Sequence, residues 1–174
     1  MINTYDNPLE GEGITNGTMR VRLAQACEIE AVQRLRYDVF YREYGAKPIS
    51  DMEELGRDYD EFDAYAEHLL VEDIEKKAII GTYRMLRSET AAKLGQFYTD
   101  DEFDIACLRN SGMNLMELGR SCVHKDYRTR PILQLLWQGI AATLSYHKID
   151  LMFGCASFQG TNVTTVREEL SYLY

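Results

Sequence analysis

The chain has 174 residues, 45% of them apolar, so it can bury one hydrophobic core and we expect a single domain. Its formal net charge of −9 argues against nucleic acid as a partner, because a phosphate backbone attracts a surplus of Lys and Arg. The same charge argues against broad attachment to anionic lipid, so any anionic partner has to meet a local basic patch.

The first third of the chain predicts one strand and one helix. Residues 1–18 are polar and rich in Gly and Asn, and we expect a flexible lead-in. Residues 19–24 alternate like a short strand, and residues 28–44 carry apolar side chains at helical spacing. Residues 45–64 are acidic with weak periodicity. An irregular segment of that length in a compact domain is typical of a functional loop.

The middle of the chain predicts three more strands. Residues 68–74 and 78–86 have the pattern of two strands in a hairpin. Residues 88–114 indicate small helical pieces and loops. Residues 116–123 then predict another strand, which a basic turn connects to the next helix.

The last third predicts a long helix between two parallel strands. Pro131 suits the first turn of a helix, and the apolar positions continue to Leu144. Residues 151–158 predict a buried strand, and residues 166–174 a helix that the end of the chain cuts off. The order of elements indicates a mixed α/β sheet with flanking helices, of the α+β kind. Its late crossover should be right-handed, with parallel strands.

Cysteine and histidine usage favours a cytoplasmic protein with reduced thiols. The four cysteines show no CxxC or Cys/His ligand spacing, and the three histidines stand far apart, so we expect no metal site. Cys122 near His124 could suggest a thiol nucleophile, but no third group orients the pair. We therefore expect Cys122 to be a small core residue. The chain also lacks an apolar stretch of roughly 18–20 residues and an export signal.

Charged residues recur in four short motifs. Within the printed sequence these are RYDVF at 36–40, DYDEFD at 58–63, GTYR at 81–84 and ELGR at 117–120. Their spacing resembles that of the acyl-homoserine-lactone (autoinducer) synthases, which share the GNAT acyltransferase fold. The longer run ELGRSCVHKDYRTRPILQLLWQGIA, followed by FGCASF, is more closely similar to the ornithine acyl-ACP N-acyltransferases of bacterial ornithine-lipid synthesis.

This resemblance implies a GNAT-like acyltransferase domain over residues 19–174, with the C-terminal part of the family's fold missing. It implies transfer of a (3-hydroxy) fatty acyl group from acyl carrier protein to the α-amine of ornithine, the first step of ornithine-lipid synthesis. The donor is carried on the phosphopantetheine of the carrier, so no separate cofactor is expected. The product would be a single-chain lipid, which is compatible with loose association with the inner membrane.

Glu117 is the first candidate for the catalytic base. An α-amine with a pKa near 8 is roughly nine-tenths protonated at pH 7, so a carboxylate base is useful. The alternative is an ordinary strand Glu paired with Arg120 or Arg84. Strict alternation would put Glu117 and Arg120 on opposite faces of the strand. A bulge at Gly119 would bring both to one site, and GNAT folds use such a bulge to offer a backbone N–H to the thioester carbonyl.

The acidic segment and the arginines predict a substrate site. Interleaving with aromatic residues suits a partly buried lining better than a solvated loop, which is the alternative. The acids could pair with arginines or bind a cationic acceptor, and an arginine fork could hold the acceptor's carboxylate. The candidates are Asp58, Asp60 and Asp63, and the arginines Arg36, Arg84 and Arg120. The resemblance adds Phe40 to this substrate-binding set.

Lys125, Arg128 and Arg130 form the clearest basic cluster of the chain. GNAT enzymes that use CoA usually have a glycine-containing loop here, whose backbone amides bind pyrophosphate. In this chain Pro131 lacks a donor and no glycine permits close approach. We therefore expect the cluster to bind the acidic acyl carrier protein and the phosphate of its phosphopantetheine arm. The alternative is a solvated turn.

Two rival functions stay open. An autoinducer synthase, or another long-chain N-acyl amino acid synthase, would use the same chemistry on a different acceptor. A non-catalytic acyl-carrier-binding domain would keep the fold and bind the carrier without turnover.

Overall fold

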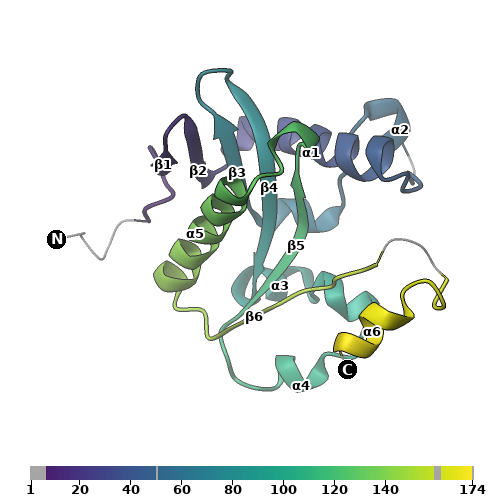
Figure 1. The fold of residues 1–174 in the computed structure, drawn as a ribbon. Helices are drawn as coiled ribbons and strands as arrows, with labels where there is room; N and C mark the ends of the chain where they lie inside the picture. The colour runs from purple at the N-terminus through teal and green to yellow at the C-terminus, as the bar shows by residue number, and fades with distance from the viewer. Residues whose placement is uncertain (1–6, 50, 159–161, 174) are drawn as a thin grey trace.

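The computed structural model describes residues 7–49, 51–158 and 162–173, which fold around one mixed sheet (Figure 1). The sheet of the described residues has six strands in the order β1-β2-β3-β4-β5-β6. They are β1 (Ile14–Asn16), β2 (Met19–Leu23), β3 (Glu67–Asp73), β4 (Ala78–Arg87), β5 (Leu115–Val123) and β6 (Leu151–Phe153). Neighbouring strands are antiparallel except β5 and β6, which are parallel. The expected mixed sheet and its parallel late strands are confirmed.

Helices cover both faces of the sheet (Figure 1). On one face, α1 (Ile29–Tyr37) follows a 3₁₀ turn, η1 (Ala26–Glu28), and continues into a wider π-helical turn, η2 (Asp38–Glu43). On the other face lies α5 (Arg130–His147). The shorter pieces are α2 (Met52–Leu55), η3 (Glu61–Ala64), α3 (Ser88–Leu94), η4 (Tyr98–Asp101), α4 (Ala106–Arg109), η5 (Lys125–Tyr127) and α6 (Arg167–Leu173).

The main core lies between α5 and the sheet. Apolar side chains at helical spacing, among them Leu136 and Ile140, pack against Val21 of β2 and Leu69 of β3. Gly139 lets the helix approach closely, because a Cβ at this position would lie 2.8 Å from Leu69 and 2.9 Å from Val21. The long α5 therefore sits directly on the central strands.

A second core on the α1 face supports the candidate site. Four apolar side chains are buried together there: Phe62 of η3, Leu86 of β4, Phe97 just before η4, and Leu115 of β5. Residues of a strand alternate between faces, so Leu86 and Arg84 both point to this side. The charged motifs of the sequence thus share the α1 face of the sheet.

The described part of the expected lead-in, residues 1–18, is packed rather than flexible. The strand β1 pairs with β2, and Leu9 is 1% exposed in the α5 core. Gly13 brings the segment against β2, because a Cβ there would lie 2.3 Å from the carbonyl oxygen of Val21. Three residues of edge strand are too few to show an alternating pattern. Residues 1–6 of the predicted lead-in lie outside the described residues.

The expected buried strand at residues 151–158 is also corrected. The strand β6 ends at Phe153, and its residues are half-buried or exposed. Its parallel pairing covers only Leu115 to Glu117 of β5. The strand pairing with β5 ends before Gly154. The other expected strands and the helix from Pro131 are confirmed, and residues 167–173 form the predicted last helix. The acidic segment holds two short pieces, α2 and η3.

Candidate active site

The strand β5 contains the expected bulge. Arg84 of β4 pairs with Gly119 and Thr82 pairs with Cys122, so Arg120 and Ser121 together oppose one residue of β4. The residue in the left-handed conformation is Arg120, with φ of 50°, and not Gly119. The extra residue brings Glu117 and Arg120 to the border of the same cavity.

This cavity has a volume of about 950 Å³ and lies between η2, β4, the β5 bulge, η4 and the segment after β6. Seven aromatic residues line it: Phe40, Tyr41, Tyr44, Tyr83, Tyr98, Phe103 and Phe158. Phe103 is 62% exposed and Phe158 is 40% exposed, which places these two at the open rim. Four charged residues also line it, Arg84, Glu102, Glu117 and Arg120, and the rest of the lining is made of small, aliphatic and Ser residues. The cavity therefore combines apolar walls with a few charged groups, as ligand sites do.

The separation of β5 and β6 leaves one edge of β5 next to the cavity. Gly154 lies against Leu118, because a Cβ built on it would be 2.2 Å from the Leu118 carbonyl oxygen. The strand pairing of β6 with β5 has ended before this contact, at the pair of Phe153 and Glu117. The backbone from Leu118 to Ser121 lines the cavity instead.

Glu117 holds η4 in place. Its Oε2 accepts a hydrogen bond from the backbone N–H of Tyr98 at 2.8 Å. Its Oε1 accepts one from the N–H of Thr99 at 2.8 Å and another from the Thr99 hydroxyl. Glu117 is 4% exposed, and neither Arg84 nor Arg120 is among its described partners. The carboxylate therefore fixes the wall that carries Tyr98.

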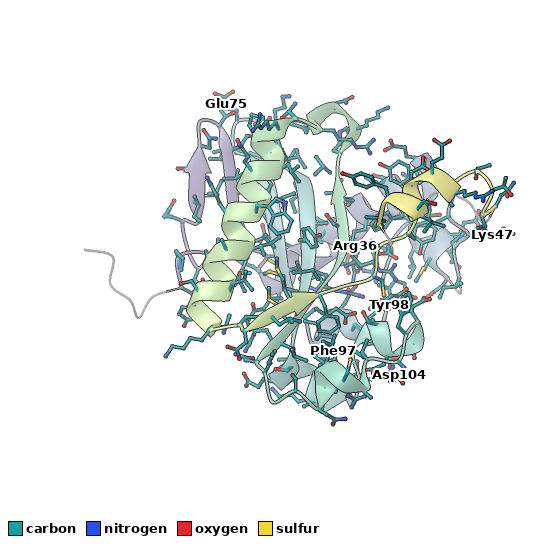
Figure 2. The ribbon with its side chains drawn as sticks, turned by 60° about the horizontal axis from the view of Figure 1, so that its bottom comes forward. Arg36, Lys47, Glu75, Phe97, Tyr98 and Asp104 are labelled. Atoms are coloured by element: carbon teal, nitrogen blue, oxygen red, sulfur yellow. The ribbon has the colours of Figure 1, made fainter. Side chains whose placement is uncertain are left out.

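The Tyr98 ring in turn lies against two arginines. The guanidinium carbon of Arg120 is 5.3 Å from the ring centroid, and that of Arg84 is 5.8 Å from it. Figure 2 shows Tyr98 and Phe97 below the buried Arg36. No sequence pattern pointed to Tyr98 or Thr99, because their place depends on a contact with Glu117, which is nearly 20 residues away in the chain.

Behind the cavity lies a buried charge cluster of three arginines and three aspartates. Arg36 is at its centre, 0% exposed, and donates to both carboxylate oxygens of Asp63 at 3.0 and 2.6 Å. Its Nε lies 2.8 Å from Oδ2 of Asp58. Burial raises the pKa of Asp63, but hydrogen bonds and charge from Arg36 and Arg84 outweigh it and lower that pKa to about 2.

Toward the solvent, the members of the cluster are more exposed and the ion pairs of Arg120 are longer. Arg84 bridges Asp60 and Asp63 with its Nη1. Arg120 reaches Asp60 at 3.3 Å and Asp58 at 3.5 Å, and its side chain is 26% exposed. All six predicted residues are thus brought together, but they pair with one another. Arg36 and Asp58 are fully buried, so only the outer members can meet a substrate.

The basic turn lies at the start of α5. Arg128 makes a bidentate pair with Glu43, with both N···O distances at 2.6 Å, and this contact raises the pKa of Arg128. Its guanidinium also lies 5.3 Å from the ring centroid of Tyr44, which lines the cavity. Lys125 and Arg130 are exposed. Of the predicted phosphate-binding residues, Arg128 is therefore already engaged with an acid.

Cys122 is 5% exposed, and burial raises the pKa of its thiol to about 12. The expectation of a small core residue is confirmed. Among the described residues, no group of three or more His, Cys, Asp or Glu side chains is arranged to hold a metal ion. The described helices also include none with the length and apolar character needed to cross a membrane.

The model of the acetyltransferase (GNAT) domain matches residues 35–138 of the chain. The L-ornithine N(alpha)-acyltransferase of Rhodobacter capsulatus is 44% identical over 161 residues, which are 88% of this chain and 62% of that protein. The chain spans 55–62% of the length of the curated relatives that it matches.

Solved structures share the fold. A predicted acetyltransferase with acetyl-CoA from Clostridium acetobutylicum superposes with a TM-score of 0.54 at 16% identity, covering 87% of this chain and 88% of that one. The AHL synthase LasI superposes with a TM-score of 0.52 at 15% identity, covering 88% of this chain and 77% of that one.

Proposed function

Because the chain belongs to the GNAT acyltransferase family, we propose that it transfers a (3-hydroxy) fatty acyl group from acyl carrier protein to the α-amine of ornithine. This reaction would be the first step of ornithine-lipid synthesis. The observation that carries the proposal is the aromatic cavity at the β5 bulge, which Glu117 and Arg120 both border. Apolar walls suit an acyl chain, and the charged groups suit an amino acid. Similarity to L-ornithine N(alpha)-acyltransferases supports ornithine as the acceptor.

The chemistry is direct attack of the neutral amine on the thioester carbonyl. The N–C bond forms, the C–S bond breaks, and the proton lost by the amine passes through the base to the leaving thiolate. Oε2 of Glu117 has one hydrogen-bond donor and keeps a lone pair for that proton, whereas Oε1 already has two donors. The backbone N–H groups of Arg120 and Ser121 at the bulge are our candidates for stabilising the oxyanion.

Arg120 is the best candidate to bind the carboxylate of the acceptor. Its contacts with Asp58 and Asp60, at 3.5 and 3.3 Å, are longer than the Arg36–Asp63 contact of 2.6 Å. A substrate carboxylate can therefore replace them at small cost. The replacement would free Oδ2 of Asp60, whose Oδ1 stays paired with Arg84, to meet an ammonium group of the acceptor.

Acyl carrier protein is favoured over CoA by the start of α5. Pro131 occupies the first turn and cannot donate a backbone hydrogen bond to pyrophosphate. Lys125 and Arg130 are exposed beside it and can meet a single phosphate and an acidic surface.

A mass-spectrometric assay tests the proposal. Acyl carrier protein and CoA carrying the same 3-hydroxyacyl chain are each offered with a panel of amino acids. We expect N-acyl-ornithine from the carrier-bound donor at a rate well above that from CoA. Product with another amine and none with ornithine would contradict the acceptor and favour a different N-acyl amino acid synthase.

The same assay separates the enzyme from a non-catalytic carrier-binding domain. Carrier binding is measured by titration beside turnover. Binding without any acyl-amine product would support the binding domain and contradict the proposed activity.

A further inference from the structure

The outer side of α5 is unlike an ordinary solvated helix face. Its exposed positions include one charged residue, Arg130, at the first position of the helix. The others are Pro131, Leu133, Gln134, Trp137, Gln138, Ala141, Ser145 and Tyr146. Leu133 and Trp137 are 53% and 44% exposed, and with Ala141 they follow at spacings of four along one side. This apolar stripe, Leu133–Trp137–Ala141, has a row of uncharged polar residues beside it.

Acidic residues are absent from the whole element. Asp and Glu make up 28 of the 174 residues, or about one in six, yet none occurs between Asp126 and Asp150. Exposed basic residues stand at both ends of the helix: Lys125 lies before it, Arg130 is its first residue and Lys148 follows it. A chain of net charge −9 thus has one helix face without acidic residues, and the exposed Asp126 and Asp150 lie just beyond its ends.

No described element covers this face. The buried side of α5 packs on the sheet through residues such as Leu136 and Ile140. Figure 1 shows α5 across the front of the sheet, with its outer side toward the viewer, and Figure 2 shows the same helix uncovered from a second direction. The stripe is therefore accessible among the described residues.

We infer that the outer side of α5 docks on the surface of a membrane that contains anionic lipid. Interfacial helices combine an apolar stripe with Trp or Tyr at headgroup level and basic residues that meet lipid phosphates. Trp137 and Tyr146 would occupy the headgroup level here, Leu133 the boundary of the acyl chains, and Arg130 and Lys148 the phosphates at the two ends. The inference does not rest on the proposed function, although an enzyme with a lipid product gains from this position.

Charge argues for lipid over the other occupants. A second copy packed antiparallel on α5 would bring Arg130 of one helix toward Lys148 of the other, and the nearest acids, Asp126 and Asp150, lie outside the helix. An acidic protein would place carboxylates over the middle of the helix, where the described face has no cation between Arg130 and Lys148. A lipid surface offers an apolar layer at the centre and anions around it.

Trp137 gives a direct test because it is the one Trp of the sequence. The probe is a titration with vesicles of phosphatidylcholine mixed with phosphatidylglycerol, with pure phosphatidylcholine for comparison. We expect the Trp emission to shift to shorter wavelength with the anionic vesicles, and lipids with brominated acyl chains to quench it. Pure phosphatidylcholine should give a weaker response.

Matched variants separate the two contributions. Leu133→Glu should lower vesicle affinity about tenfold or more, because it replaces an inserted apolar group by a charge of the wrong sign. Lys148→Asn keeps a residue suited to the left-handed position of Lys148 and should lower affinity severalfold for anionic vesicles only. Ile49→Glu, at a 65% exposed apolar site before α2, is the control and should leave vesicle binding unchanged.

Three outcomes would overturn the inference. One is a Trp137 emission that no vesicle changes. Another is a shift that depends on protein concentration without vesicles, which would assign the face to a second copy. The third is a shift that only acyl carrier protein produces. Acyl transfer to soluble ornithine is measured without vesicles, so its presence or absence leaves this test independent of the proposed function.

Discussion

Glu117 has two roles, and Glu117→Gln affects both, because its NH2 group would face one of the N–H donors of η4. The carboxylate holds η4 through Tyr98 and Thr99 and is also our candidate base. Glu117→Gln is expected to lower kcat by about 10²-fold, because the amide cannot take the proton of the amine. The measurement is single-turnover acyl transfer with saturating donor.

Thr99→Ala is the control for this substitution. It removes one donor to Oε1 and leaves Oε2 unchanged, so we expect kcat to fall by less than about tenfold. Equal losses in the two variants would reduce Glu117 to a residue that positions η4.

The left-handed backbone of Arg120 leads to a prediction about stability. A non-glycine residue at φ of 50° is strained by about 1 kcal/mol, which glycine avoids. Arg120→Gly and Arg120→Ala both lose the guanidinium, so both should lose most acyl transfer to ornithine. Arg120→Gly should nevertheless be about 1 kcal/mol more stable than Arg120→Ala in urea unfolding. Equal free energies of unfolding would show that the bulge stores no strain at this residue.

At the scale of elements, the packing of α5 on the sheet depends on Gly139. A Cβ at that position would come within 2.9 Å of Leu69 and Val21, which is closer than normal contact. Gly139→Ala is therefore expected to destabilise the fold by about 1–3 kcal/mol, despite the better helix propensity of Ala. Urea unfolding at constant pH measures this change. Ser145→Ala, on the exposed side of the same helix, is the control and should not lower stability.

The sequence predicted the elements with strong periodicity and missed those that depend on distant contacts. Alternation and helical spacing were sufficient for β3, β4 and α5. The short β1 was missed because three residues carry no pattern, and β6 was predicted too long because an apolar run does not say where pairing stops.

In the candidate site too, features with a local sequence pattern were predicted and those that depend on distant contacts were not. The bulge was predicted from the need to bring Glu117 and Arg120 together, and it is present one residue beyond Gly119. The six charged residues predicted as a group lie together in the structure, and their binding of substrate stays a prediction. Their mutual pairing was one of two alternatives that the sequence left open. The burial of Arg36 and Asp58 could not be predicted, because it depends on how η3 packs against α1 and β4.

At the scale of the whole molecule, the buried charge cluster makes stability depend on pH. The pKa of Asp63 is lowered to about 2 in the folded protein, below the ordinary value of 3.8. The sign follows from linkage: the stabilising contribution is complete above pH 4 and is lost as pH falls toward 2. The difference of nearly two pKa units corresponds to about 2 kcal/mol at neutral pH.

Asp63→Asn tests this linkage. The variant should be less stable than the original chain at pH 7, because Arg36 and Arg84 lose a charged partner. The gap in the free energy of unfolding should narrow as the pH is lowered from 4 to about 2, because protonation then removes the same charge from the original chain. A gap of constant size would place the acid sensitivity elsewhere.

The pair of Arg128 and Glu43 also makes the rim of the cavity respond to ionic strength. The two groups are about one-third exposed, and Arg128 lies on Tyr44, which lines the cavity. Moderate salt weakens this pair and leaves Arg128 free for the phosphate of the donor. More salt screens the attraction between the donor and the basic turn, because the Debye length falls to about 8 Å near 0.15 M. The KM for the carrier-bound donor is therefore expected to pass through a minimum as salt rises. In Glu43→Gln the minimum should disappear and KM should rise steadily, so ion concentration would act as a tuning variable for donor capture.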